Sequence, residues 1–241
     1  MNAMIFAAGL GSRLRPITDQ LPKALVVVAG QTLLERAIHL LAMQGVSRIV
    51  INVHHHAEQI VSFVQNQGYF GLDIQFSDER EELLETGGGL LKAAPLLNNG
   101  KPFIVLNSDI ICNIDFAKMM KSHIDKKAFA TLAVRERPES SRQLLFDEQG
   151  LLGGWENRKT AECILFKEES LLKPLAFSGI HILNPEWFEL CSQRGKFSII
   201  DSYLELGRKW PIVTHRHDED YWFDVGSIEK LAEAETFLKG K

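Results

Sequence analysis

The segment that follows the first apolar run carries residues suited to binding a polyphosphate. It contains Gly9, Gly11 and Arg13, and Lys23 follows. Glycines let backbone N–H groups approach phosphate oxygens closely, and the two cations can neutralise a triphosphate. A dinucleotide-binding fingerprint requires glycine where Leu14 stands, and a P-loop requires Gly-Lys-Ser/Thr directly after the loop. We therefore predict a phosphate-binding loop of another kind, with a purely structural turn as the alternative.

Two aspartates far apart in the chain are candidate metal ligands. Asp109 directly follows an apolar run, and Asp224 lies in a Trp-Phe-Asp-Val-Gly segment. Mg²⁺ prefers oxygen ligands and commonly takes one or two carboxylates, with phosphates and water completing the octahedron. Because an aspartate that closes a strand is otherwise often a cap or turn residue, the spacing alone leaves both interpretations open.

A second glycine-rich segment, Glu85-Thr86-Gly87-Gly88-Gly89, precedes a helical pattern. Consecutive N–H groups at the start of a helix, with no side chains above them, can contact an anion, a flat base or a sugar hydroxyl. Three glycines in a row are entropically unfavourable in a helix, so a flexible turn is the alternative. We favour a binding segment.

These segments must be positioned by the elements around them, and the first half of the chain alternates between strand and helix patterns. We expect strands at residues 3–7, 48–53, 72–77 and 102–106, and helices at residues 32–44, 57–66 and 88–94. Strands separated by helices imply right-handed crossovers and a mostly parallel sheet covered on both faces. Ligands gather at the carboxyl ends of such strands, so residues 9–23 and 107–109 can converge there.

The second half of the chain is richer in strand patterns. We expect strands at residues 128–134, 143–146, 151–155 and 176–183, a hairpin turn at residues 147–150, and a final helix at residues 227–238. No linker rich in Gly, Ser or Pro divides the chain. We therefore predict an α/β fold of three layers with a mixed, mostly parallel central sheet, formed by a single domain over residues 1–241 with a small antiparallel lobe inserted at about residues 135–175.

Composition excludes several classes of protein. The 241 residues are 45% hydrophobic and 24% charged, with a net charge of -4 and no basic run, so we expect a folded protein that does not bind nucleic acid. The three cysteines, Cys112, Cys163 and Cys191, lack metal or disulfide spacing. No apolar run approaches a bilayer span or a secretory signal, so we expect a cytoplasmic protein without membrane contact. The sequence does not specify an oligomeric state.

The glycine loop, extended to Ala7-Ala8-Gly9-Leu10-Gly11-Ser12-Arg13-Leu14 and Pro22-Lys23, resembles the signature loop of the sugar-1-phosphate nucleotidyltransferase family. Residues 84–89, 177–180 and 223–226 extend the likeness toward the N-acetylmuramate-1-phosphate uridylyltransferase subgroup, in the expected order along the chain. It weakens between residues 135 and 175. The resemblance implies the nucleotide-diphospho-sugar transferase fold, in which the inserted lobe binds the sugar.

The resemblance also implies a role for individual residues. Arg13 would contact the leaving pyrophosphate, Lys23 would lie beside the reacting phosphates, and Asp109 and Asp224 would hold a catalytic Mg²⁺. Arg13, Lys23 and Asp109 are thus the expected catalytic residues. The expected nucleotide-binding residues are Ala7, Ala8, Gly9, Gly11, Ser12, Arg13, Lys23, Glu85, Gly87 and Gly88. The expected substrate-binding residues are Asn107, Ser178 and Gly179.

The reaction that the resemblance implies transfers a nucleoside monophosphate from a nucleoside triphosphate to a sugar 1-phosphate and releases pyrophosphate. UTP and N-acetylmuramate 1-phosphate are the best-matched substrates. Mannose- or heptose-1-phosphate guanylyltransferase is an alternative, and Pro22-Lys23-Ala24-Leu25, which also occurs in phosphocholine cytidylyltransferases, leaves that activity open.

Two other classes of protein are weighed against this enzyme. A hydride-transferring enzyme is disfavoured by the arginine and lysine of the loop. A noncatalytic nucleotide sensor is disfavoured because Arg13, Lys23, Asp109 and Asp224 are all present. Because a single helix follows Asp224, we expect no fused β-helical acetyltransferase.

Overall fold

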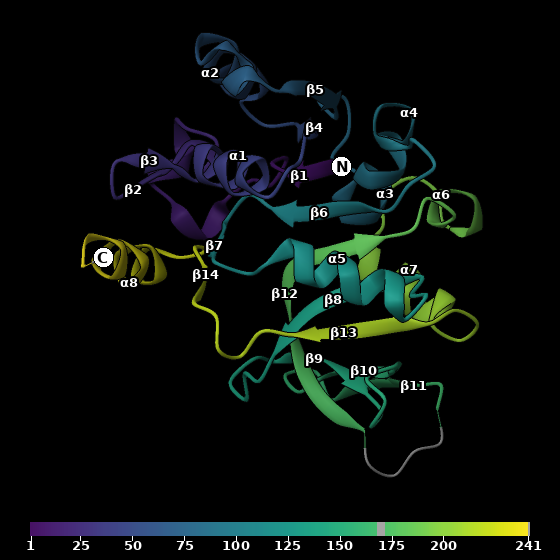
Figure 1. The fold of residues 1–241 in the computed structure, drawn as a ribbon. Coiled ribbons are helices and arrows are strands. Elements are labelled where there is room, and N and C mark those ends of the chain that lie inside the picture. Colours follow the sequence, from purple (N-terminus) through teal and green to yellow (C-terminus); the bar gives the residue numbers. More distant parts are fainter. Residues whose placement is uncertain (168–171, 241) are drawn as a thin grey trace.

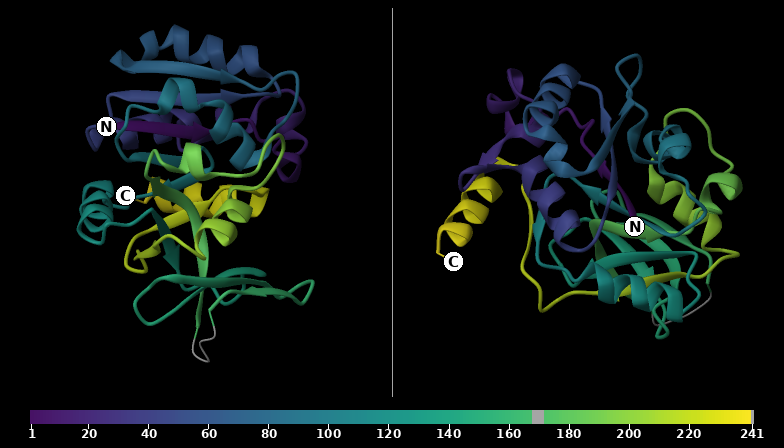
Figure 2. Two further views of the ribbon diagram at one scale, coloured as in Figure 1. Left: turned by 90° about the vertical axis from the view of Figure 1, so that its right-hand side faces the viewer. Right: turned by 45° about the horizontal axis from the view of Figure 1, so that its top comes forward.

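The computed structural model describes residues 1–167 and 172–240, which form one large sheet covered by helices on both faces (Figure 1, Figure 2). The strand order is β11-β10-β9-β12-β6-β1-β4-β5, and β8 pairs with β12 and with β13. Among the described residues, no helix combines the length and apolarity that crossing a membrane would require.

The first half of the chain supplies four parallel strands, as predicted. These are β1 (Asn2–Phe6), β4 (Arg48–Val53), β5 (Asp73–Asp78) and β6 (Phe103–Asn107). The connecting helices are α1 (Leu33–Met43), α2 (Ala57–Asn66), α3 (Glu85–Lys92) and α4 (Ala94–Leu97). The expected start of the third helix at residue 88 is wrong, because α3 begins at Glu85 and encloses the three glycines.

The second half adds antiparallel strands around β12 (Lys173–Leu183). This strand pairs with β6, β8 (Ala130–Arg135) and β9 (Arg142–Phe146), while β10 (Leu152–Asn157) and β11 (Glu162–Leu165) extend the edge. A parallel partner of β8, β13 (Ile212–Arg216), completes the sheet. The sheet is therefore mixed, and mostly parallel outside β9–β11, as predicted. The single domain and the lobe at about residues 135–175 stay predictions, and residues 168–171 of that lobe lie outside the described residues.

Several short elements were not foreseen. They are β11, β13, β2 (Val27–Val28), β3 (Gln31–Thr32), β7 (Ile110–Cys112), α5 (Phe116–Asp125), α6 (Trp187–Leu190), α7 (Ile199–Leu206) and β14 (Trp222–Asp224). Of these, β7 and β14 form a two-stranded antiparallel sheet in which Ile110 lies opposite Asp224. This pairing brings the end of the chain to the carboxyl end of β6, just before the last helix, α8 (Ile228–Lys239).

The core follows the alternation of side chains along the buried strands. Ile5 of β1 packs with α1 on one face of the sheet, whereas Met4 packs with Leu90 of α3 on the other. A smaller cluster joins Leu14 of the first loop to Val225 and to α8. The glycine loop is therefore anchored on the C-terminal segment as well as on the sheet.

Candidate active site

The carboxyl ends of β1 and β6 open onto one cavity of about 530 Å³, a size typical of small-molecule sites. It is lined by Phe6, Ala7, Ala8, Gly9, Leu10, Gly11, Ser12, Arg13, Lys23, Asn52, Leu83, Glu85, Thr86, Asn107, Ser108, Asp109, Ser198 and Gly226. The structure thus gathers most of the predicted site residues around one space. Gly87, Gly88, Ser178, Gly179 and Asp224 are not part of this lining.

Gly11 sets the shape of the first loop. Its φ of 64° is in the left-handed region, and a Cβ atom there would lie 2.9 Å from Thr18 Cγ2 and 3.0 Å from Lys23 Cβ. The Thr18 hydroxyl donates to the Gly11 carbonyl at 2.8 Å. Gly9 differs, because a Cβ atom there would meet nothing within 4 Å. Gly11 is therefore required by the fold of the loop, and Gly9 leaves open space in the cavity.

Lys23 and Asp109 join the first loop to the end of β6. The Lys23 ammonium donates to Asp109 Oδ2, and the two side chains are only 12% and 19% exposed. Removing one partner of such a shielded pair leaves an uncompensated charge. The pair therefore holds a cation and a carboxylate at the wall of the cavity.

Asp224 and Arg13 flank Gly226, which lines the same cavity. The Val225 N–H donates to the Asp109 carbonyl at 2.9 Å, which fixes β14 beside the end of β6. The position that a Cβ atom on Gly226 would occupy lies 2.7 Å from Arg13 Nη2 and 2.8 Å from Asp224 Oδ1. Glycine is therefore needed where the guanidinium and the carboxylate approach each other.

The two aspartates have the chemistry of a Mg²⁺ site that a nucleotide would complete. Asp109 and Asp224 come from neighbouring segments and supply oxygen donors, and Lys230 Nζ lies 3.5 Å from Asp224 Oδ2. Within residues 1–167 and 172–240, no three His, Cys, Asp or Glu side chains are grouped to hold a metal. Since Mg²⁺ is commonly bound by one or two carboxylates together with substrate phosphates, the pair fits that ion.

A buried polar network that sequence analysis missed supports the loop. Glu79 is 0% exposed, and its carboxylate accepts from Asn52 Nδ2 at 2.7 Å and from the Leu84 N–H at 3.2 Å. Asn52 Oδ1 in turn accepts from the Ala7 N–H at 2.7 Å. Burial raises the pKa of the Glu79 carboxyl, although the hydrogen bond from Asn52 opposes that shift. The available signal was a polar residue, Asn52, within the apolar run of β4 and an acid, Glu79, directly after β5.

The second glycine segment does not present the N–H groups that we predicted. The N–H groups of Gly87 and Gly88 donate to the Phe197 carbonyl, at 2.9 and 3.4 Å. A Cβ atom on Gly88 would lie 2.1 Å from the Gly195 carbonyl oxygen, and one on Gly87 would lie 2.2 Å from the Phe197 ring. In this structure the two N–H groups bond to the protein, because α3 uses the glycines to pack closely. That Gly87 and Gly88 contact a nucleotide stays a prediction. Within this segment, Glu85 and Thr86 line the cavity.

Ser178 and Gly179 lie beneath the site. Ser178 is 1% exposed, its hydroxyl is hydrogen-bonded to His217 Nε2 at 2.6 Å, and its carbonyl accepts from Trp222 Nε1 at 2.9 Å. A Cβ atom on Gly179 would lie 2.7 Å from Asn107 Nδ2. The two residues therefore position Trp222 and Asn107. Of the three predicted substrate-binding residues, Asn107 alone lines the cavity.

Comparisons with known proteins identify the family of this chain. The sequence profile of the family described as nucleotidyl transferase matches residues 2–241. An N-acetylmuramate alpha-1-phosphate uridylyltransferase from Neisseria meningitidis is 32% identical, over 98% of this chain and 97% of that protein. A mannose-1-phosphate guanyltransferase from Yarrowia lipolytica is 31% identical, over 94% of this chain and 61% of that longer protein.

A solved structure has the same fold. HddC from Yersinia pseudotuberculosis, complexed with GMP-PN, superimposes with a TM-score of 0.78 and covers 98% of this chain and 99% of its own. Its sequence identity to this chain is 24%. At that identity the likeness supports the fold and does not identify a substrate.

Proposed function

Because this chain belongs to the nucleotidyl transferase family, we propose that it transfers uridine monophosphate from UTP to N-acetylmuramate 1-phosphate and releases pyrophosphate. The single observation that carries the proposal is the meeting of Arg13, Lys23 and Asp109 with Gly226 around one cavity. Activity as a sugar-1-phosphate nucleotidyltransferase follows from the family. The choice of UTP as the nucleotide and of N-acetylmuramate 1-phosphate as the acceptor is the more specific part of the proposal.

The proposed reaction exchanges one phosphoanhydride bond for another. A phosphate oxygen of the acceptor attacks the α-phosphorus of UTP, the bond between that phosphorus and the bridging oxygen to the β-phosphate breaks, and pyrophosphate leaves. The acceptor oxygen is already anionic near neutral pH, so no protein nucleophile is required. Arg13 stabilises the charge that develops on pyrophosphate, and Lys23 neutralises the reacting phosphates.

We also propose Mg²⁺ as the cofactor, held by Asp109 and Asp224. When bound, it would screen the repulsion between the anionic acceptor and the triphosphate. Asp109 also positions the Lys23 ammonium, and Asn52 holds the Ala7 N–H in place at the start of the loop. Glu85 and Thr86 line the cavity on α3 and are candidates to contact the nucleoside.

Two alternative substrate pairs remain candidates. The similarity to mannose-1-phosphate guanyltransferase favours GTP with a mannose or heptose 1-phosphate, although this chain spans 61% of that relative. The Pro22-Lys23-Ala24-Leu25 segment keeps CTP with phosphocholine as a third pair. A noncatalytic nucleotide sensor would bind a nucleotide and release no pyrophosphate.

The test is pyrophosphate release measured over a grid of UTP, GTP, CTP, ATP and dTTP against sugar 1-phosphates and phosphocholine, with and without Mg²⁺. We expect the largest kcat/KM for UTP with N-acetylmuramate 1-phosphate, and turnover that requires Mg²⁺. A larger value for another pair would replace the substrates and keep the reaction class. No release from any pair, by a protein that still binds nucleotide, would reject the enzyme in favour of the sensor.

A further inference from the structure

A second cavity, of about 330 Å³, adjoins the candidate active site along β14. Asp224 lines this second cavity, whereas Gly226, two residues further on, lines the first. Arg135, Arg137 and Trp222 also face it. Because the first cavity is lined by the glycine loop, Arg13 and Lys23, a ligand in the second cavity would lie next to it, at Asp224.

Among the described residues, Arg135 is the cation of this cavity that forms no ion pair with an acid. Three of the four acids that line it are paired with other bases: Glu136 with Arg216 at 2.8 Å, Glu139 with Arg137 at 3.1 Å, and Asp224 with Lys230 at 3.5 Å. The fourth, Glu233, is exposed and forms no ion pair with Arg135. Within residues 1–167 and 172–240, the half-buried Arg135 side chain makes no hydrogen bond or ion pair and has only a ring contact. Partial burial of an unpaired charge is unfavourable, so the site suits an anion supplied by a ligand.

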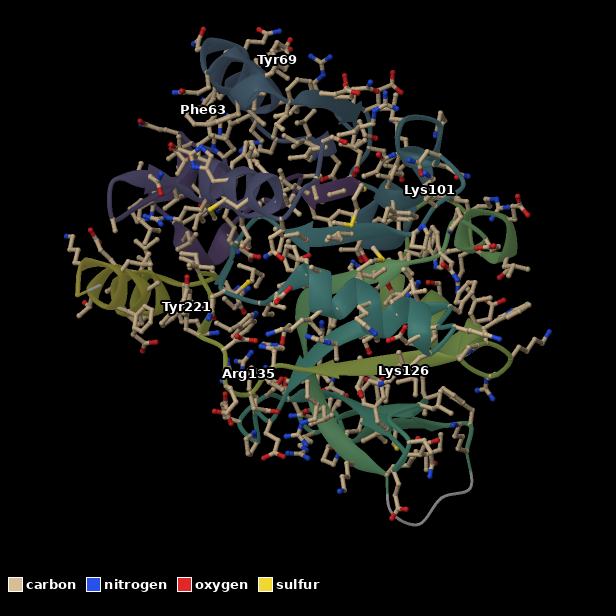
Figure 3. The ribbon with its side chains drawn as sticks, viewed as in Figure 1. Phe63, Tyr69, Lys101, Lys126, Arg135 and Tyr221 are labelled. Atoms are coloured by element: carbon tan, nitrogen blue, oxygen red, sulfur yellow. The ribbon has the colours of Figure 1, made fainter. Side chains whose placement is uncertain are left out.

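Trp222 holds the two guanidinium groups in place. Its indole N–H donates to the Ser178 carbonyl at 2.9 Å, and its ring lies 4.7 Å from Arg137 Cζ and 5.9 Å from Arg135 Cζ. A guanidinium over an aromatic ring keeps the N–H groups at its edge available, and these match the two oxygens of a carboxylate. Figure 3 shows Arg135 beside the chain that joins β13 to β14, which leads directly to Asp224.

We infer that Arg135, assisted by Arg137, binds a carboxylate carried by the acceptor sugar. The inference rests on the proposed function and assigns a residue to its substrate choice. The lactyl carboxylate of N-acetylmuramate 1-phosphate is such a group. Mannose 1-phosphate, glucose 1-phosphate and N-acetylglucosamine 1-phosphate have no second anionic group. Arg135 therefore selects an acidic sugar 1-phosphate.

The test compares two acceptors that differ in the lactyl group, N-acetylmuramate 1-phosphate and N-acetylglucosamine 1-phosphate. Each is measured with the wild-type protein and with its variants. We expect Arg135→Ala to lower kcat/KM for the muramate by about 10- to 100-fold, the range of a hydrogen bond between charged groups. The same variant should change kcat/KM for the glucosamine by less than about twofold, and Arg135→Lys should recover part of the loss. Arg208→Ala is the matched control, since Arg208 also stacks over a ring, that of Phe166, away from both cavities.

Two results would overturn the inference and leave the reaction class of the proposed function standing. One is release of pyrophosphate by wild-type protein with no preference for the muramate. The other is an equal loss for both acceptors in Arg135→Ala, which would place Arg135 on the 1-phosphate or on pyrophosphate. Calorimetric titration of both acceptors into the wild type and the variant tests the same difference without turnover. The same affinity for both acceptors in wild-type protein would reject the carboxylate site even if no activity were found.

Discussion

This chain has two glycine-rich segments near the same cavity. Gly9–Gly11 follows β1, and Gly87–Gly89 lies within α3. In the first, Gly9 faces open space and Gly11 adopts a left-handed backbone that shapes the loop. In the second, the N–H groups of Gly87 and Gly88 are already bonded to Phe197, and Cβ atoms there would overlap other atoms. Glycines therefore serve ligand access in the first segment and close packing in the second.

The two segments are also physically connected. A Cβ atom on Gly89 would lie 2.5 Å from Glu79 Oε1, and Glu79 holds Asn52, which accepts from the Ala7 N–H. Packing at α3 therefore supports the position of the backbone just before Gly9. Substitutions in the two segments should differ in what they damage, and the residues between them should affect both.

The largest change in stability should come from Gly88→Ala. Its methyl group would overlap the Gly195 carbonyl, a backbone atom that cannot move aside easily, and overpacking of this kind should lower the free energy of unfolding by about 3 kcal/mol or more. Thermal unfolding measures the loss, with Gly240→Ala as the control because a Cβ atom there makes only ordinary contacts, at 3.6 Å. Unchanged stability with lost nucleotide binding would mean that the second segment is a ligand loop after all.

An intermediate effect on both stability and binding is expected from Glu79→Ala. The change leaves Asn52 Nδ2 and the Leu84 N–H without their acceptor, which lowers the free energy of unfolding by about 1–3 kcal/mol. It should also raise the KM for the nucleotide, because Asn52 no longer fixes the Ala7 N–H. Chemical denaturation and steady-state kinetics measure the two effects. Glu81→Ala, at an exposed neighbour, should change neither.

The raised pKa of the Glu79 carboxyl predicts that the stability of the protein depends on pH. Burial raises the pKa of Glu79 above its ordinary value of 4.5, so the folded protein binds that proton more tightly than the unfolded chain. The contribution of this proton to the free energy of unfolding is fully present below pH 4.5 and is lost as the pH rises through the raised pKa. Denaturation curves measured over a series of pH values should show this loss of stability in the wild type and not in Glu79→Gln. The same slope in the variant and the wild type would assign the dependence to another group.

The smallest change in stability, with a clear change in binding, should come from Gly9→Ala. The added methyl group meets no protein atom within 4 Å, so the free energy of unfolding should stay within about 0.5 kcal/mol of wild type. The methyl group enters the space proposed for the triphosphate, so we expect the KM for the nucleotide to rise by about 10-fold, equivalent to about 1.4 kcal/mol. An unaltered KM would remove Gly9 from the nucleotide site.

Sequence patterns predicted the main helices and strands of this molecule better than the contacts between segments that are remote in the chain. The spacing of apolar residues predicted β1, α1, β4 and α2 because each element has a regular period and a clear boundary. It missed β7 and β14, which have three residues each and are stabilised by each other across more than 100 positions of sequence. The role of Gly87 and Gly88 was equally out of reach, because it depends on Phe197, which is remote in the chain.

We propose that Asp109 and Asp224, brought together by β7 and β14, hold one divalent ion against the triphosphate. The most direct test is a titration with Mn²⁺ in the presence of a nonhydrolysable UTP analogue, followed by electron paramagnetic resonance, on wild type, Asp109→Ala and Asp224→Ala. We predict one nucleotide-dependent site in wild type and in the control Asp125→Ala, and loss of that site in both test variants together with a fall in kcat of at least about 10²-fold. A folded Asp109→Ala or Asp224→Ala protein that binds the ion and turns over as wild type does would show that these two carboxylates do not hold the ion.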